Sequence, residues 1–307
     1  MIKVDVITGF LGAGKTTLIR NMLESGLFES KKTVVIVNEF GKVGIDGTLM
    51  NYDGLEVYEI ANGCICCSSK ENFSQTLHQI STTLTPEQIL IEPSGIFMIE
   101  DLLHLMKEPV LMSLCQIHAI ITVIDAQRFM SQQKVYNQFF KSQLSYATAL
   151  WINKVSQLSE GDLALLEVDL NHFNSKVQSV VNHGDLFSVQ DMTMLLAETR
   201  IGGVDNEHQH GHHHHLKHTA FENYGFYSEQ LFTKDQLLEL GSALRSGDFG
   251  KVIRGKGLFK TLDCTLEFQY VDGDLTLTPF KGPAIEHKMS IIGEGLQTDK
   301  IDRYFSQ

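Results

Sequence analysis

The chain has 307 residues, more than a single core usually holds, so two domains are expected. A hydrophobic share of 43% with 20% charged residues is typical of a globular protein. The formal net charge of −12 argues against nucleic acid or an anionic membrane as a partner, and no apolar run approaches the roughly 18 residues of a membrane span.

The start of the chain and its cysteines indicate a cellular setting. The chain opens with a predicted strand rather than a basic and apolar leader, so secretion is not expected. There are five cysteines, and three of them stand within four positions. An odd number with this clustering disfavours a disulfide framework and favours reduced thiols. A cytoplasmic protein is therefore predicted.

The first predicted strand, residues 2–7, leads into Gly-Phe-Leu-Gly-Ala-Gly-Lys-Thr at residues 9–16, and a helical stretch follows at 17–23. Strand, glycine-rich loop and helix are the context that the G-x-x-x-x-G-K-[ST] phosphate-binding motif requires. Glycines let the backbone N–H groups turn toward phosphates, and the helix adds the positive end of its dipole. Lys15 is expected to reach the β and γ phosphates, and the Thr16 hydroxyl to hold Mg²⁺. The nucleotide-binding residues predicted here are Gly9, Gly12, Ala13, Gly14, Lys15, Thr16 and Thr17.

Apolar strands and helical segments alternate from there to about residue 200. Further strands are predicted at 32–37, 55–60, 88–91, 119–124 and 147–152, with helices at, for example, 69–80, 126–147 and 159–173. Continuous apolar strands alternating with helices predict a mostly parallel sheet covered on both faces, with ligands at the carboxyl ends of the strands. The residues expected at that edge are Lys15, Glu39, the clustered cysteines, Glu92, Asp125 and Asn153.

The composition changes after residue 200. Residues 201–218 are rich in histidine and glycine with almost no apolar content, which predicts a linker. Residues 1–200 are therefore assigned to an α/β domain and 219–307 to a smaller α+β domain with an antiparallel sheet. In the latter we expect helices at 233–245 and 298–305, strands at 252–258, 262–270, 275–280 and 290–293, and a hairpin turn at 272–274.

Three thiols form the candidate metal site. Cys64 and Cys66 are two apart, so an extended backbone would put both sulfurs on one side, while Cys67 would join them only if the chain turns at Asn62-Gly63. Thiolates suit Zn²⁺ or similar soft ions, completed by oxygen or imidazole. There is no second cysteine pair, so a structural zinc finger is not expected. An incomplete shell suits metal exchange, and the competing interpretation is a set of buried, inert cysteines.

The linker histidines are a second candidate metal-binding segment. They are His208, His210, His212, His213, His214, His215 and His218. Flexible imidazoles bind Zn²⁺, Ni²⁺ or Co²⁺ with modest selectivity, as a buffer or landing site, and the competing interpretation is a cloning tag. The remaining cysteines, Cys115 and Cys264, are predicted to lie in the core. His78, His104 and His118 are predicted to be structural or exposed.

Together these segments resemble the CobW-type metallochaperone GTPases, relatives of the HypB and UreG nickel-insertion proteins. The resemblance is carried by residues 9–17, Asn38-Glu39-Phe40-Gly41, Cys64-Ile-Cys66-Cys67, Glu92-Pro-Ser-Gly95, the linker and Arg254-Gly-Lys-Gly257. It implies GTP hydrolysis that gates metal transfer to a client protein. It also implies that Glu39 lies in a nucleotide-responsive switch near Mg²⁺ or the carried metal. Glu92 would take the Walker B position and act on Mg²⁺ through water, beside Lys15 and Thr16 in the catalytic set.

The base-recognition motif departs from this family pattern. Members usually carry Asn-Lys-x-Asp, and this chain has Asn153-Lys154-Val155-Ser156. The usual aspartate accepts hydrogen bonds from guanine N1–H and the exocyclic amine, and a serine hydroxyl replaces only part of that. The loss is expected to weaken guanine preference by about 1–3 kcal/mol. Asn153 and Lys154 remain, so GTP is the predicted nucleotide.

The predicted function is thus a GTP-hydrolysing metallochaperone, monomeric or homo-oligomeric, that carries Zn²⁺ (or Co²⁺ or Ni²⁺) to a client protein. Mg²⁺–GTP would order residues 38–50 and shape the thiolate site, and hydrolysis would relax them. Two other classes stay open. One is an ATP-dependent small-molecule kinase, and the other is a metal buffer in which the nucleotide is structural.

Overall fold

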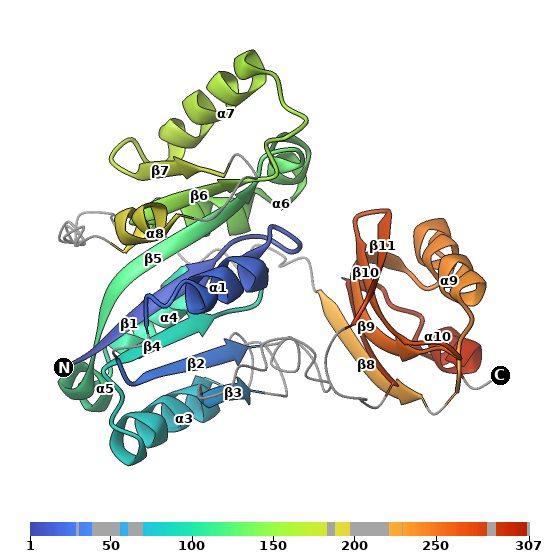
Figure 1. Ribbon diagram of the computed structural model, residues 1–307, viewed down its shortest axis with the longest axis horizontal. Helices are drawn as coiled ribbons and strands as arrows, with labels where there is room; N and C mark the ends of the chain where they lie inside the picture. The colour runs from blue at the N-terminus through green and yellow to red at the C-terminus, as the bar shows by residue number, and fades with distance from the viewer. Residues whose placement is uncertain are drawn as a thin grey trace. The chain divides into compact units, whose positions relative to one another are not determined.

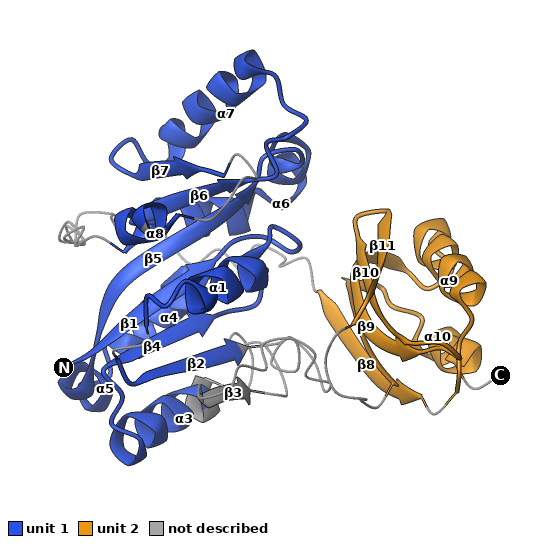
Figure 2. Cartoon of the chain, viewed as in Figure 1, with its two compact units in different colours: residues 1–38, 52–60, 64–205 blue, residues 39–51, 61–63, 206–307 orange. Residues whose placement is uncertain are grey.

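The computed structural model describes residues 1–28, 31–38, 56–60, 70–182, 188–196, 221–228, 230–280 and 287–305. The chain divides into two compact units (Figure 2). Of the described residues, those up to 196 belong to the first unit and those from 221 onward to the second. Glu39, Cys64, Cys66, Cys67 and the histidines of 201–218 lie outside the described residues, so what the sequence indicates for them stays a prediction.

The first unit is a seven-stranded sheet flanked by helices (Figure 1). Its strand order is β3-β2-β4-β1-β5-β6-β7, and each described pairing is parallel. The strands are β1 (Ile2–Thr8), β2 (Thr33–Asn38), β3 (Glu56–Ile60), β4 (Gln88–Glu92), β5 (Cys115–Asp125), β6 (Ala149–Asn153) and β7 (Gln178–Val181). The helices are α1 (Lys15–Glu24), α3 (Lys70–Thr83), α4 (Ile99–Met106), α5 (Pro109–Leu114), α6 (Phe129–Ser145), α7 (Glu160–Phe173) and α8 (Val189–Leu195).

The central strands are apolar on both sides because helices cover both faces. Every residue of β4 is buried, and so are the last five residues of β1. β1 lies between β4 and β5 in the middle of the sheet, so the loop that follows Thr8 opens at the centre of the carboxyl edge. The predicted parallel α/β sheet is confirmed, and its topology places the glycine-rich loop where parallel sheets bind ligands.

The second unit is a five-stranded antiparallel sheet in the order β11-β10-β9-β12-β8, which confirms the predicted α+β architecture. Its elements are β8 (Glu222–Ser228), α9 (Lys234–Ser246), β9 (Lys251–Lys260), β10 (Thr265–Val271), β11 (Asp274–Pro279), β12 (His287–Glu294) and α10 (Thr298–Phe305). Asp272 and Gly273 both have positive φ, 50° and 98°, which is the conformation of a tight β10–β11 hairpin turn.

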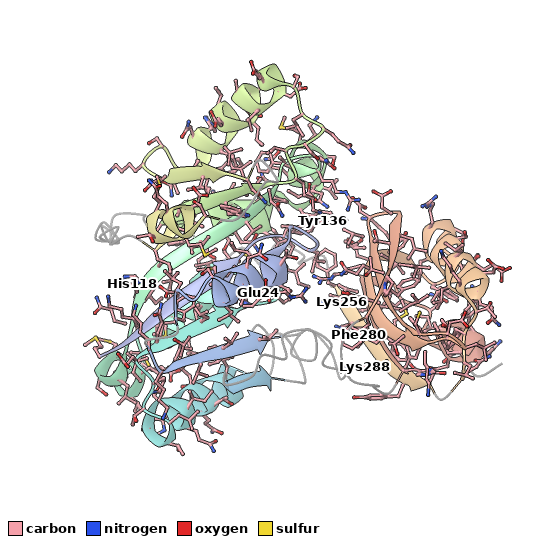
Figure 3. All side chains as sticks on the ribbon, viewed as in Figure 1. Glu24, His118, Tyr136, Lys256, Phe280 and Lys288 are labelled. Carbon is pink, nitrogen blue, oxygen red and sulfur yellow. The ribbon has the colours of Figure 1, made fainter. Side chains whose placement is uncertain are left out.

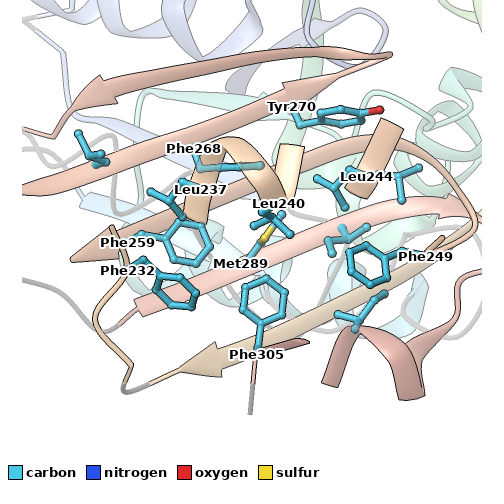
Figure 4. Close-up of a cluster of buried hydrophobic side chains, with 14 of the residues drawn as sticks. Phe232, Leu237, Leu240, Leu244, Phe249, Phe259, Phe268, Tyr270, Met289 and Phe305 are labelled. Carbon is cyan, nitrogen blue, oxygen red and sulfur yellow. The ribbon is translucent and has the colours of Figure 1, made fainter. Parts of the chain in front are cut away.

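The core of the second unit forms where the two helices meet one face of this sheet (Figure 4). α9 contributes Leu237, Leu240 and Leu244 at helical spacing, each at most 1% exposed. α10 contributes Ile301 and Phe305, and the ring centroids of Phe305 and of Phe226 on β8 are 4.0 Å apart. A capping box between Thr233 and Gln236 begins α9. The unit therefore has a hydrophobic core of its own.

Some local features differ from the sequence-based expectation. α4, α5, α8, β7 and β8 have no counterpart among the predicted elements, and β5 begins at Cys115 rather than at residue 119. The prediction that Cys264 lies in the core is wrong, because the residue is exposed near the β9–β10 turn. Cys115 is buried as predicted, with its Sγ 3.2 Å from Ser81 Oγ, and burial raises the pKa of its thiol. Among the described residues, no helix is both long and apolar enough to cross a membrane.

Candidate functional site

The loop between β1 and α1 has a backbone that requires glycine. Gly9, Gly12 and Gly14 have φ of 140°, 78° and 108°, conformations that side chains disfavour. A Cβ on Gly9 would lie 2.3 Å from Val123 O, and one on Gly14 would lie 2.5 Å from Asn153 Nδ2. Both glycines thus allow the loop to approach its neighbours closely. This geometry supports the phosphate-binding interpretation.

The start of α1 provides the positive end of the site. Gly14 is the N-cap residue and offers no side-chain cap to the first-turn amides. Such amides, together with the helix dipole, bind anions. Lys15 begins the helix and is only 4% exposed, with Nζ donating to Gly9 O at 3.0 Å and Phe10 O at 3.4 Å. The loop's own carbonyls therefore hold the ammonium group over the loop.

The loop is also anchored by an aromatic cluster. Phe10 is 2% exposed, and its ring stacks on Tyr136 and Phe140 of α6, with centroids 4.9 Å and 5.2 Å apart. α6 departs from helical geometry at Tyr136, where φ is −116° and ψ is 30°. Packing of this kind stabilises a loop whose glycines would otherwise leave it many conformations.

Two oxygen-bearing side chains meet beside Lys15. Thr16 Oγ1 donates to Glu92, with Oε1 and Oε2 at 3.0 Å and 3.1 Å. Glu92 ends β4, which pairs in parallel with β1, so the two strand ends bring Glu92 next to the loop. Its side chain is 4% exposed. A hydroxyl and a carboxylate are the hard ligands that Mg²⁺ prefers. The residues present therefore fit the magnesium ion that the loop implies.

The residues that end β5 and β6 contact the phosphate-binding loop directly. Asn153 Nδ2 donates to Ala13 O at 2.9 Å, and Lys154 Nζ donates to Gly12 O at 2.8 Å. Lys154 adopts a left-handed φ of 61° and also pairs with Asp125 Oδ2 at 2.7 Å. Asp125 in turn accepts from the backbone N–H groups of Gln127 and Arg128. The predicted base motif is thus hydrogen-bonded to the loop.

The segment after Glu92 contacts the loop from another side. A Cβ on Gly95 would lie 2.5 Å from Leu11 N, so this glycine is needed for the contact. Gln143 of α6 donates through Nε2 to Gly95 O at 3.0 Å and to Phe97 O at 3.4 Å. Gln143 is not among the residues predicted from the sequence, and the glycine of Glu92-Pro-Ser-Gly95 is the only signal that points to this contact.

The structure therefore brings Lys15, Thr16, Glu92, Asp125, Asn153 and Lys154 together at one sheet edge, as expected from the strand ends. His118, which was predicted to be structural or exposed, lies on β5 (Figure 3). Its Nδ1 lies 2.8 Å from Oδ1 of the fully buried Asp5, so it has a structural partner. Within the part of the chain that the structure describes, no group of three or more histidine, cysteine or acidic residues is placed to hold a metal ion.

A family model described as "CobW/HypB/UreG, nucleotide-binding domain" matches residues 3–181, more than half of the chain. The chain belongs to the CobW/HypB/UreG family. The resemblance drawn from the sequence is thereby confirmed. The matched range contains the whole seven-stranded sheet except the first residue of β1, so the phosphate-binding loop lies in the nucleotide-binding domain of this family.

Curated relatives carry names that refer to zinc. The chain is 30% identical over 247 residues to "Zinc chaperone CobW" of Pseudomonas aeruginosa, covering 68% of this chain and 64% of that protein. It is 34% identical over 154 residues to "Zinc chaperone YeiR" of Escherichia coli, covering 50% of this chain and 47% of that protein. A Schizosaccharomyces pombe relative, "Zinc-regulated GTPase metalloprotein activator 1", is 32% identical, with coverage of 63% and 49%. The chain thus spans less than two thirds of the length of these three relatives.

A solved structure supports the fold over both units. The Zn(II)-bound triple mutant of the YjiA GTPase aligns with 99% of this chain and 98% of its own, at a TM-score of 0.50 and 21% identity. A structural similarity at this level of sequence identity shows a shared fold. That fold agrees with a P-loop α/β unit followed by an antiparallel α+β unit.

Proposed function

We propose that the protein is a GTP-hydrolysing metallochaperone that binds Zn²⁺ (or Co²⁺) through Cys64, Cys66 and Cys67 and delivers it to a client protein. The observation that carries this proposal is the loop's contact with both Glu92, through Thr16, and the base motif, through Asn153 and Lys154, in a chain of the CobW/HypB/UreG family. The proposed setting is the cytoplasm, and the proposed partner is a metalloprotein client.

The nucleotide half of the proposal follows from charge and position. Lys15 and the first turn of α1 would neutralise the phosphates, while Asn153 and Lys154 would hold the base end of the nucleotide. Thr16 and Glu92 would hold Mg²⁺, which supplies further neutralisation of the phosphate charge when bound. Catalysis of this kind depends on positioning rather than on a strong general base, so slow intrinsic turnover is expected.

The metal half rests on the cysteine motif and on where β2 and β3 end. The two strands pair in parallel through Asn38 and Ile60, and so end at the same edge of the sheet. Glu39 follows Asn38 directly, and Cys64 follows Ile60 by four residues. The strands that precede both proposed ligand segments thus end at the carboxyl edge that carries the phosphate-binding loop. Thiolates favour Zn²⁺, and the linker histidines would serve as a weaker landing site.

The proposal is tested with three proteins: wild type, Lys15→Ala and Cys64→Ala/Cys66→Ala. Wild type is expected to hydrolyse GTP slowly and to bind Zn²⁺ tightly enough to compete with a chelator. Lys15→Ala should abolish hydrolysis while keeping thiolate-bound zinc. Cys64→Ala/Cys66→Ala should keep hydrolysis and lose the tightly bound zinc. Retention of full zinc affinity by the cysteine variant would contradict the proposed metal site, and absence of hydrolysis in wild type would contradict the enzyme.

A nucleotide-dependent kinase remains a second candidate because of Ser156, which weakens the case for guanine. It predicts ATP as the preferred nucleotide, transfer of phosphate to a small acceptor, and no effect of Cys66→Ala. Comparing ATP and GTP hydrolysis by the same wild-type protein, with and without Zn²⁺, separates the two candidates. Clear ATP preference with no zinc response would favour the kinase.

A further inference from the structure

A residue outside the predicted site contacts the base motif. Asn182 follows β7 and donates through Nδ2 to Asn153 Oδ1 at 2.9 Å. Its backbone is fixed as well, because Asn182 N–H donates to Ile152 O at 2.8 Å and continues the pairing of β7 with β6. The backbone of Asn182 is therefore held beside β6, next to the residue that its side chain contacts.

The two contacts of the Asn153 carboxamide define its orientation. Nδ2 donates to Ala13 O, and Oδ1 accepts from Asn182. Rotating the Asn153 amide by 180° would set its Oδ1 against the Ala13 carbonyl oxygen, and these two acceptors cannot hydrogen-bond. It would also set Nδ2 against Asn182 Nδ2, and these two donors cannot hydrogen-bond unless the Asn182 amide rotates as well. Ala13 thus sets the orientation, and Asn182 supports it by donating to Asn153 Oδ1.

This orientation matters because Nδ2 carries two N–H groups. One serves Ala13 O, and the second can donate to an acceptor on a purine edge, such as N7. Nδ2 is also close to the loop, since a Cβ on Gly14 would lie 2.5 Å from it. A rotated amide would present an acceptor oxygen to the purine instead.

We infer that Asn182 is a positioning residue for base recognition, acting by holding the Asn153 amide with its donor toward the nucleotide. The inference rests on the proposed nucleotide site and adds a residue to it. It gains weight in this chain because Ser156 replaces the carboxylate that usually shares base recognition. A larger part of the base contact then falls on Asn153, and so on the group that orients it.

The test measures GDP and 7-deaza-GDP affinity for wild type, Asn182→Ala, Asn182→Asp, Asn153→Ala and Asn153→Ala/Asn182→Ala. Asn182→Ala should weaken GDP binding about three- to tenfold, as expected for one lost orienting hydrogen bond. Asn182→Asp should weaken it more, because a carboxylate only accepts and so favours the rotated amide. The double variant should bind no more weakly than Asn153→Ala. Asn137→Ala is the matched control, since Asn137 is an exposed asparagine of α6 bonded to Gln133.

7-Deaza-GDP separates positioning from a general structural role. Wild type should bind it several-fold more weakly than GDP, and the Asn182 variants should lose most of that difference. The positioning role is overturned if the Asn182 variants bind GDP as tightly as wild type does. It is also overturned if they bind GDP more weakly but keep the wild-type difference between GDP and 7-deaza-GDP affinity. If wild type binds GDP and 7-deaza-GDP equally, the inference also fails while the nucleotide site stands. If wild type binds neither, the proposed nucleotide site itself is overturned.

Discussion

At the residue scale, Ser156 makes the sharpest difference from the family's usual base motif. The absent carboxylate would read the 2-amino group of guanine, which hypoxanthine lacks. We therefore expect wild type to bind GDP and IDP with similar affinity. Ser156→Asp should raise the GDP-to-IDP affinity ratio about tenfold, or about 1.4 kcal/mol. Titrations with both nucleotides measure the ratio.

Ser156→Ala is the matched control for that substitution, because it removes the hydroxyl without adding a carboxylate. Its GDP-to-IDP ratio should stay near that of wild type. A wild type that already discriminates strongly against IDP would show that another group reads the 2-amino position, and the expectation for Ser156 would then be wrong.

The site residues that could be predicted are those with local signals. Lys15 and Thr16 stand in an unbroken eight-residue motif, and Glu92, Asp125 and Asn153 end apolar strands of a parallel sheet. Asn182 and Gln143 had no such signal. Their partners are Asn153 and Gly95, 29 and 48 residues away, and such pairings depend on the register of elements that the sequence pattern does not define.

At the element scale, α6 holds the segment that follows β4. Gln143 is fully buried, and its Nε2 supplies hydrogen bonds to the carbonyls of Gly95 and Phe97. Gln143→Ala leaves these buried acceptors without that donor and should lower the free energy of unfolding by about 1–3 kcal/mol. It should also slow GTP hydrolysis, because Gly95 packs against the loop at Leu11.

Unfolding of the first unit can be followed through Trp151, the one tryptophan of the chain, which is buried in β6. The matched control is Gln133→Ala, on the same helix, because Gln133 makes a surface hydrogen bond to Asn137. The control should keep the wild-type unfolding midpoint. Equal midpoints for both variants would show that the Gln143 contacts do not stabilise this segment.

The two strands that the sequence did not predict, β7 and β8, share a physical reason. β7 is only four residues long, Gln178–Val181, too short to show a strand pattern, and β8 contains a central glycine among polar and aromatic residues. Their strand conformation depends on pairing with β6 and β12 rather than on local preference. By contrast, α9 has apolar residues at helical spacing between a capping box and Gly247, so it was predictable.

At the scale of the whole molecule, the proposal combines a nucleotide site with two kinds of metal-binding segment. Deleting residues 207–218 should remove most of the weaker metal capacity and leave a tight thiolate site with wild-type affinity. Cys64→Ala/Cys66→Ala should remove the tight thiolate site and leave the weaker metal capacity. Zinc titrations against a chelator measure both classes of site, and loss of tight binding in the linker deletion would favour a metal buffer over a chaperone.

The central claim is that nucleotide state controls metal affinity. The most direct measurement is Zn²⁺ affinity of the wild-type protein, by chelator competition, with a non-hydrolysable GTP analogue and Mg²⁺ and then with GDP and Mg²⁺. A difference of about tenfold or more, about 1.4 kcal/mol of coupling free energy, is predicted, and it should disappear in Cys64→Ala/Cys66→Ala. Equal zinc affinities in the two nucleotide states would contradict the account.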